Sequence, residues 1–102
     1  MRTGERDEAL RLLGMAYEKA PAEARLAYVY AVALGSAGRL EDAIRVLQEN
    51  VDRHPFHRDS LIALVNYGRE ANRPDIARHY AEDLLAQYPL DGDIAALART
   101  VM

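Results

Sequence analysis

The chain of 102 residues contains no cysteine. Disulfides, zinc ribbons, thiol catalysis and covalent haem attachment are therefore excluded within it. Serine is almost as scarce, since Ser36 and Ser60 are the only two, and neither lies in a turn typical of a catalytic nucleophile. A glycine-rich phosphate-binding loop is also missing. These absences predict that the chain is not an enzyme and holds no cofactor.

Lysine occurs only once, at Lys19, and the other basic residues are arginines that alternate with Asp and Glu. With a formal net charge of −3 and no basic stripe, the chain lacks the signature of a nucleic-acid-binding module. No stretch is long and apolar enough to span a membrane, and the opening MRTGERDEAL lacks the apolar region of a signal peptide. We expect a soluble chain, cytoplasmic by default, or periplasmic if a signal exists upstream.

Proline is rare, but its placement is regular. Three of the four prolines, Pro21, Pro55 and Pro89, stand 34 residues apart. Residues of other kinds recur at the same spacing, and we call each set of positions 34 residues apart a column. The columns contain alanine (Ala9, Ala43, Ala77), residues that tolerate positive φ (Gly4, Gly38, Asn72) and large apolar residues (Leu12, Val46, Tyr80). A fixed period of this size predicts a repeat architecture.

Hydrophobic residues within each unit follow a helical period. One stripe of an amphipathic helix contains Leu40, Ala43, Ile44, Leu47 and Val51. No window shows the alternation of a strand over a useful length. The pattern predicts six helices, over residues 5–19, 23–36, 39–53, 58–71, 74–87 and 91–101. We expect Gly38 and Asn72 to end helices in a left-handed conformation, and the three spaced prolines to end the second helix of each unit.

The unit AYVYAVALGSAGRLEDAIRVLQENVDRHP resembles the tetratricopeptide repeat. Its matching residues are Ala31, Leu34, Gly38, Ala43, Leu47 and Pro55. The resemblance covers essentially the whole chain. It implies an all-α, right-handed α-solenoid of antiparallel helix pairs. The sequence departs from the family pattern at Asn50, where a small alanine is usual, and at Gly68, where a large side chain is usual. We expect both departures to weaken local packing.

The resemblance also implies a division of the chain. It comprises the second helix of an incomplete repeat (1–21), two repeats (22–55 and 56–89) and a C-terminal capping helix (90–102). The first predicted helix carries apolar residues around too much of its circumference for one buried stripe. Two explanations stay open. Either the chain is part of a larger protein whose neighbouring domain packs on residues 5–19, or these residues pair with a second copy in a homodimer.

The stretch HPFH, with His54 and His57, raises the question of a metal site. A structural zinc site needs four ligands and a catalytic one about three, and few candidates accompany these histidines. By register His54 precedes the helix-ending Pro55, while His57 begins the next helix. We predict no metal site and a solvated corner, against which the ring of Phe56 packs.

In the family that the chain resembles, the first helices of successive units line a concave groove. Eight residues would line such a groove here: Arg25, Tyr28, Val32, Ser36, Asp59, Ile62, Asn66 and Arg69. Three of them are apolar where solvent favours polar residues, and Asn66 and Arg69 offer an amide and a guanidinium to an acidic or C-terminal group. The predicted function is a scaffold that binds a peptide or protein segment. The alternatives are a face without a ligand, one covered by another domain, or a structural module that self-associates through residues 5–19.

Overall fold

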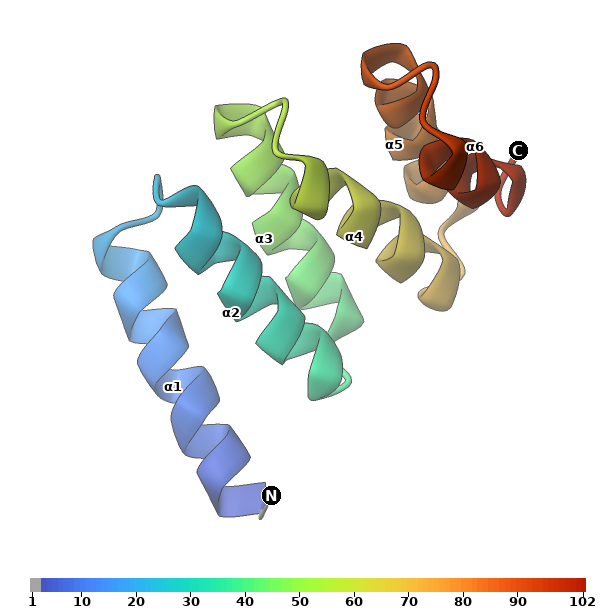
Figure 1. Ribbon diagram of the computed structural model, residues 1–102. Coiled ribbons are helices and arrows are strands. Elements are labelled where there is room, and N and C mark those ends of the chain that lie inside the picture. The colour runs from blue at the N-terminus through green and yellow to red at the C-terminus, as the bar shows by residue number, and fades with distance from the viewer. Residues whose placement is uncertain (1–2) are drawn as a thin grey trace.

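The computed structural model describes residues 3–102, which form six α-helices (Figure 1). The helices are α1 (Thr3–Lys19), α2 (Ala24–Ser36), α3 (Leu40–Arg53), α4 (Arg58–Glu70), α5 (Pro74–Gln87) and α6 (Gly92–Arg99). The predicted all-α class is confirmed, and no strand occurs within these residues. The last helix ends at Arg99 rather than at residue 101, because Thr100 and Val101 form a turn.

The helices form an elongated array in which each helix packs on the next (Figure 1). The principal-axis extents are 41, 25 and 21 Å. Helices α2, α4 and α6 lie on one side of the array, with α3 and α5 behind them, and α2 contacts α4 directly (Figure 1). We call the side formed by α2, α4 and α6 the first-helix face.

Two equivalent turns join the helices of the α2–α3 and α4–α5 hairpins. Gly38 has a φ of 81° and Asn72 has a φ of 56°, so the predicted left-handed conformation of both residues is confirmed. After each of them the chain donates back to the preceding helix, with 2.9 Å from Arg39 N to Leu34 O and 2.7 Å from Arg73 N to Gly68 O. This is the Schellman arrangement, which satisfies the last carbonyl groups of the helix. Gly4, of the same sequence column, lies inside α1 instead.

The spaced prolines follow the ends of α1, α3 and α5 by two residues. Two of them also link successive corners. Arg53 Nη1 donates to Pro21 O at 3.4 Å, and Gln87 Nε2 donates to Pro55 O at 3.0 Å. Arg53 and Gln87 stand 34 residues apart, as do the two prolines, so the same corner-to-corner contact occurs twice.

The core runs along the array between α2 and α6. Its fully buried large apolar side chains are Leu34, Leu47, Leu61, Leu64, Leu84, Ile94 and Val65. Ala43 and Ala77 are also buried, with 0% and 1% of their surface exposed. Small side chains at these two positions allow neighbouring helices to pack closely. Ala9, of the same column, is exposed. A repeated alanine therefore indicates a buried position only where neighbouring helices surround that position.

The expectation that Gly68 weakens packing is wrong. A Cβ atom on Gly68 would lie 2.9 Å from the backbone N and 3.2 Å from the Cα of Ala77. Real Cβ atoms essentially never come closer than 3.0 Å to other heavy atoms. The missing side chain therefore allows α4 to approach the backbone of α5.

Asn50, the second departure, is fully buried within a polar network between three helices. Its Nδ2 donates to Ala24 O on α2 at 3.1 Å and to Ser60 Oγ on α4 at 2.9 Å. Ser60 Oγ lies 2.8 Å from His57 Nδ1 and is itself buried. Asn50 Oδ1 accepts no hydrogen bond from residues 3–102. Asn50 thus fixes the position of α4 on the α2–α3 hairpin through hydrogen bonds, in place of the close packing that an alanine gives.

We expect Ser60→Ala to lower the free energy of unfolding by about 1–3 kcal/mol, because buried Asn50 Nδ2 loses a partner. Asn50→Leu combined with Ser60→Ala removes both polar groups, and its cost should be smaller than the sum of the single changes by roughly 1 kcal/mol. Urea denaturation of the four proteins measures this coupling. Additive costs would show that the Asn50–Ser60 bond contributes nothing to stability.

Candidate protein-binding face

The eight predicted groove residues belong to α2 and α4, two of the three helices that form the first-helix face. Four of them are exposed, namely Arg25, Ser36, Asp59 and Arg69. The other four are half-buried, namely Tyr28, Val32, Ile62 and Asn66. Tyr28 and Ile62 also pack against the buried core. Three of the four half-buried residues are apolar, whereas all four exposed residues are charged or polar.

A hollow of about 530 Å³ brings two of the predicted residues together near the end of α4. Asn66 and Arg69 line it, together with Tyr67 and Glu70. An amide, a phenol, a guanidinium and a carboxylate thus converge on one space. Such a set can hydrogen-bond a polar or charged group while the aromatic ring makes an apolar contact.

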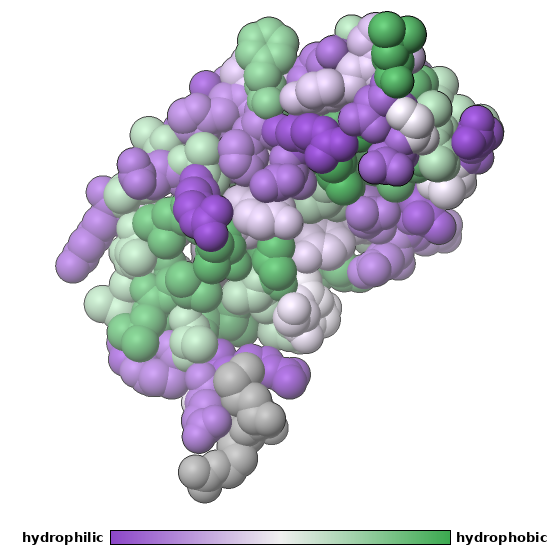
Figure 2. Space-filling model, viewed as in Figure 1, coloured by the Kyte–Doolittle hydropathy of each residue, from purple (hydrophilic) through white to green (hydrophobic). Residues whose placement is uncertain are grey.

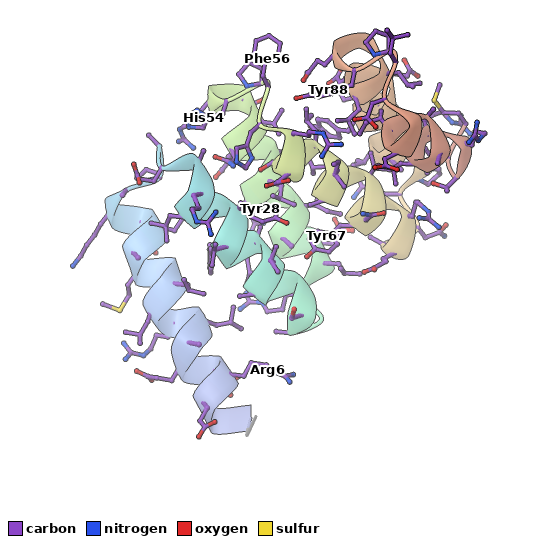
Figure 3. The ribbon with its side chains drawn as sticks, in the orientation of Figure 1. Arg6, Tyr28, His54, Phe56, Tyr67 and Tyr88 are labelled. Atoms are coloured by element: carbon purple, nitrogen blue, oxygen red, sulfur yellow. The ribbon has the colours of Figure 1, made fainter. Side chains whose placement is uncertain are left out.

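Tyr67 belongs to this face although the sequence did not predict it. Its ring lies against α2, because a Cβ atom on Gly35 would lie 2.7 Å from Tyr67 Cζ and Oη. Burial raises the pKa of the Tyr67 phenol, and the charges of Tyr28 and Glu70 raise that pKa further. Figure 3 shows Tyr28 and Tyr67 on the same side of the molecule, near the boundary between α2 and α4. A glycine inside a helix, such as Gly35, is the sequence signal for this close approach.

The corner between α3 and α4 orients the start of the face. His57 Nδ1 accepts from Ser60 N at 3.3 Å and so caps α4, and its ring centroid lies 6.0 Å from that of Tyr28. His54 Nε2 lies 2.7 Å from Ala22 O in the preceding corner. Both histidines therefore serve the structure of the corner.

The expectation that Phe56 packs against this corner is wrong. Its side chain is 73% exposed, and Figure 3 shows the ring projecting away from the molecule. The inward contacts of the corner are made instead by His54, with Ala22 O, and by His57, with Ser60 Oγ.

Helix α6 is tied to α4 by charged groups. Asp91 caps α6 by accepting from Asp93 N at 2.9 Å and from Ile94 N at 3.2 Å. Arg58 Nη2 lies 3.1 Å from Asp91 Oδ2, and its guanidinium carbon lies 5.5 Å from the centroid of the Tyr88 ring. The hydrogen bond from Ile94 N is the main cause that lowers the pKa of Asp91, and Arg58 lowers it further. These contacts fix α6 at the end of the first-helix face.

The side chains of this face can make apolar contacts and hydrogen bonds with a ligand. Ser60 and His57 have the geometry of a nucleophile and a base, but Ser60 is fully buried and its hydroxyl also accepts from Asn50. Residues 3–102 contain no group of three or more His, Asp or Glu side chains arranged to hold a metal ion. Within the same residues no helix has both the length and the apolar character needed to cross a membrane.

Comparison with known proteins agrees with this architecture. A family model described as Tetratricopeptide repeat matches residues 1–65, which is more than half of the chain. No curated protein matches the chain. Repeats of this family generally mediate protein–protein interactions, and the family is in general a non-catalytic scaffold. On the basis of the matched residues, the chain belongs to the tetratricopeptide repeat family.

Proposed function

We propose that the first-helix face is a concave groove that binds a peptide or a protein segment. The segment would lie across α2 and α4, with apolar side chains against Tyr28, Val32 and Ile62. An acidic side chain or a C-terminal carboxylate would sit at the hollow beside Asn66 and Arg69. This arrangement corresponds to a general mode of peptide recognition, in which apolar contacts give affinity and one polar group fixes the register.

The observation that carries the proposal is the hollow of about 530 Å³ lined by Asn66, Tyr67, Arg69 and Glu70. Ile62 lies one helical turn before Asn66 on α4 and is half-buried, as Tyr28 on α2 is. The Arg69 side chain forms no ion pair within residues 3–102. Its planar guanidinium can therefore offer two parallel donors to an incoming carboxylate.

Glu70 and Asp59 limit the acidity of a suitable ligand. Glu70 lines the same hollow as Arg69, and exposed Asp59 lies near the opposite end of the face, on the first turn of α4. A strongly acidic segment would bring like charges together there, which costs affinity. We therefore expect a segment with one negative group near Arg69 and apolar side chains elsewhere.

We expect Tyr28→Ala combined with Ile62→Ser to weaken peptide binding about tenfold or more, corresponding to roughly 1.4 kcal/mol, because two apolar contacts are lost at the centre of the face. The probe is a peptide selected from a random display library on the immobilised wild-type chain. Fluorescence anisotropy of the labelled peptide gives its Kd, and far-UV circular dichroism verifies the helix content.

The matched control combines Glu82→Ala with Ala86→Ser, two exposed positions of α5. This control should bind the peptide as the wild type does. Arg69→Gln should remove the preference for a free C-terminal carboxylate over its amide, because the glutamine has no positive charge. Equal affinity of the Tyr28→Ala, Ile62→Ser protein and the wild type would reject this face as the contact surface.

A further inference from the structure

A second surface, which adjoins the proposed peptide contacts on α2 but includes none of them, carries unpartnered apolar side chains on α1. Leu12 is 52% exposed and Met15 is 44% exposed, and Ala9 is exposed beside them. Two of these residues have a buried counterpart 34 positions later, since Val46, the counterpart of Leu12, is only 6% exposed and Ala43, the counterpart of Ala9, is fully buried. The counterpart of Met15 is Glu49, which is exposed as Met15 is. Helix α3 packs against both α2 and α4, whereas no helix of residues 3–102 covers Ala9 and Leu12 in α1.

Helix α2 extends this surface. Val29 is exposed, and Leu26 and Ala33 are half-buried. The corresponding residues of α4 include Ser60 and Ala63, which are buried. Figure 2 shows a continuous hydrophobic patch over α1 and α2, whereas polar side chains are more frequent over the other helices on this side. We call this surface the α1–α2 patch.

The repeat geometry shows what shape the α1–α2 patch accepts. Elsewhere in the array the equivalent surface of a second helix and of the next first helix is covered by one further helix, as α2 covers α3 and contacts α4. A helix is therefore the element that fits between α1 and α2 on their open side. Single exposed apolar residues are ordinary on a protein surface, but a continuous patch across two helices indicates an interaction site.

The charges along α1 indicate which helix fits. Five exposed residues form one line with alternating spacings of three and four residues: Glu5, Glu8, Leu12, Met15 and Lys19. This is the spacing of a coiled-coil contact line. The line is acidic at its start, apolar in the middle and basic at its end. Glu8 forms an ion pair with Arg11, whose Nη1 also lies 3.3 Å from Met15 Sδ.

A second copy of α1 matches this line in one orientation only. In an antiparallel pair centred on Leu12, Glu5 faces Lys19 of the partner subunit, and the symmetry repeats this contact at the other end. A parallel pair would instead place Glu5 against the same acidic residue of the other chain, and Lys19 against the same basic one. The self-complementary order of charges selects a second copy of this chain as the occupant.

We propose that the chain forms a twofold symmetric homodimer in which the α1 helices pair antiparallel and the α1–α2 patches of the two copies cover each other. Leu12 lies at the twofold axis. The apolar side chains supply the driving force, and the end charges set the orientation. The contacts of the dimer lie outside the eight residues proposed to bind a peptide.

The test is the molar mass from light scattering coupled to size exclusion, measured over a range of concentrations of the whole chain. We expect a mass approaching twice 11.4 kDa as the concentration rises to about 500 µM. Leu12→Glu places two like charges at the axis and should raise the dimer Kd by a factor on the order of 100. The control Leu90→Glu, at a position 98% exposed on another part of the chain, should leave the Kd unchanged.

A charge exchange tests the antiparallel orientation. Glu5→Lys and Lys19→Glu should each raise the dimer Kd by about two- to tenfold, and the two changes together should restore it. Circular dichroism of each variant verifies that the helices persist.

A wild-type chain that stays monomeric at about 500 µM overturns the proposal and leaves a helix of another protein as the occupant. A dimer that survives Leu12→Glu, or two charge changes that weaken it additively, also overturns the proposed contact. Neither result affects the peptide-binding experiment, which uses substitutions on the first-helix face.

Discussion

Ala43→Glu is expected to lower the free energy of unfolding by about 3–5 kcal/mol, because it places an uncompensated charge in a fully buried position. Domains of this size have a total stability of about 5–15 kcal/mol, so the loss is a large share of it. The corresponding fall in thermal midpoint is about 15 °C or more. Thermal melting followed by far-UV circular dichroism measures it.

The chain supplies a matched control for this change at the same repeat column. Ala9 is exposed on α1, so Ala9→Glu should leave the thermal midpoint within about 2 °C of the wild type. Ala77→Glu, at the third residue of the column, should behave like Ala43→Glu. Both comparisons are made at a protein concentration at which the chain is monomeric. Equal loss of stability for Ala9→Glu and Ala43→Glu would contradict the open environment of α1.

The repeat register explains how much of the fold could be predicted from the sequence. Residues of one kind that recur every 34 positions indicate a structural feature that recurs with them. Gly38 and Asn72 thus predicted the two turns, and Ala43 and Ala77 predicted two close contacts between helices. The same rule misjudges Ala9, which has the residue type of its column without the surrounding helices. The periodicity of the sequence predicts the contacts between helices within the array. It does not predict the burial of α1, which depends on what packs on that helix.

The buried network of Asn50 and Ser60 was missed, although the sequence contains a signal for it. Asn50 occupies a column with Ala16 and Leu84, and Ser60 occupies one with Leu26 and Ile94. Both columns are polar only in the middle unit, and the two polar residues hydrogen-bond each other. Paired departures from a repeat pattern therefore indicate a contact, while each departure taken alone suggested only weaker packing.

The candidate site was predicted in part. Asn66 and Arg69 do share one hollow, because residues three apart on a helix lie on the same side. Tyr67 was missed because it follows Asn66 by one residue, which places its side chain about 100° further around the helix. Its ring rests on Gly35, and Tyr67 nevertheless lines the hollow. Helical spacing predicts the direction of a side chain and not the surface on which a long aromatic side chain comes to rest.

Gly68→Ala is the second change for which we expect a large effect, a loss of about 1–3 kcal/mol in the free energy of unfolding. The new methyl group would lie within 3.2 Å of the backbone N and Cα of Ala77. A backbone cannot rotate away as a side chain can, so α4 and α5 would have to separate at their turn. The hydrogen bond from Arg73 N to Gly68 O, at 2.7 Å, would be strained by the same movement. Urea denaturation measures the loss.

Two other glycines separate this steric effect from helix propensity, which by itself favours alanine over glycine by roughly 0.5–1 kcal/mol inside a helix. At Gly4 no atom lies within 4 Å of an added Cβ, so Gly4→Ala should keep or slightly raise the stability. At Gly35 the three atoms nearest to the added Cβ all belong to the Tyr67 side chain, which can move. The loss should therefore be smaller than at Gly68 and should be accompanied by altered peptide binding. We therefore expect Gly4→Ala to be the most stable of the three variants, Gly35→Ala to be intermediate and Gly68→Ala to be the least stable, because of what each added methyl group would contact. A Gly68→Ala protein as stable as Gly4→Ala would show that α4 and α5 do not need this close approach.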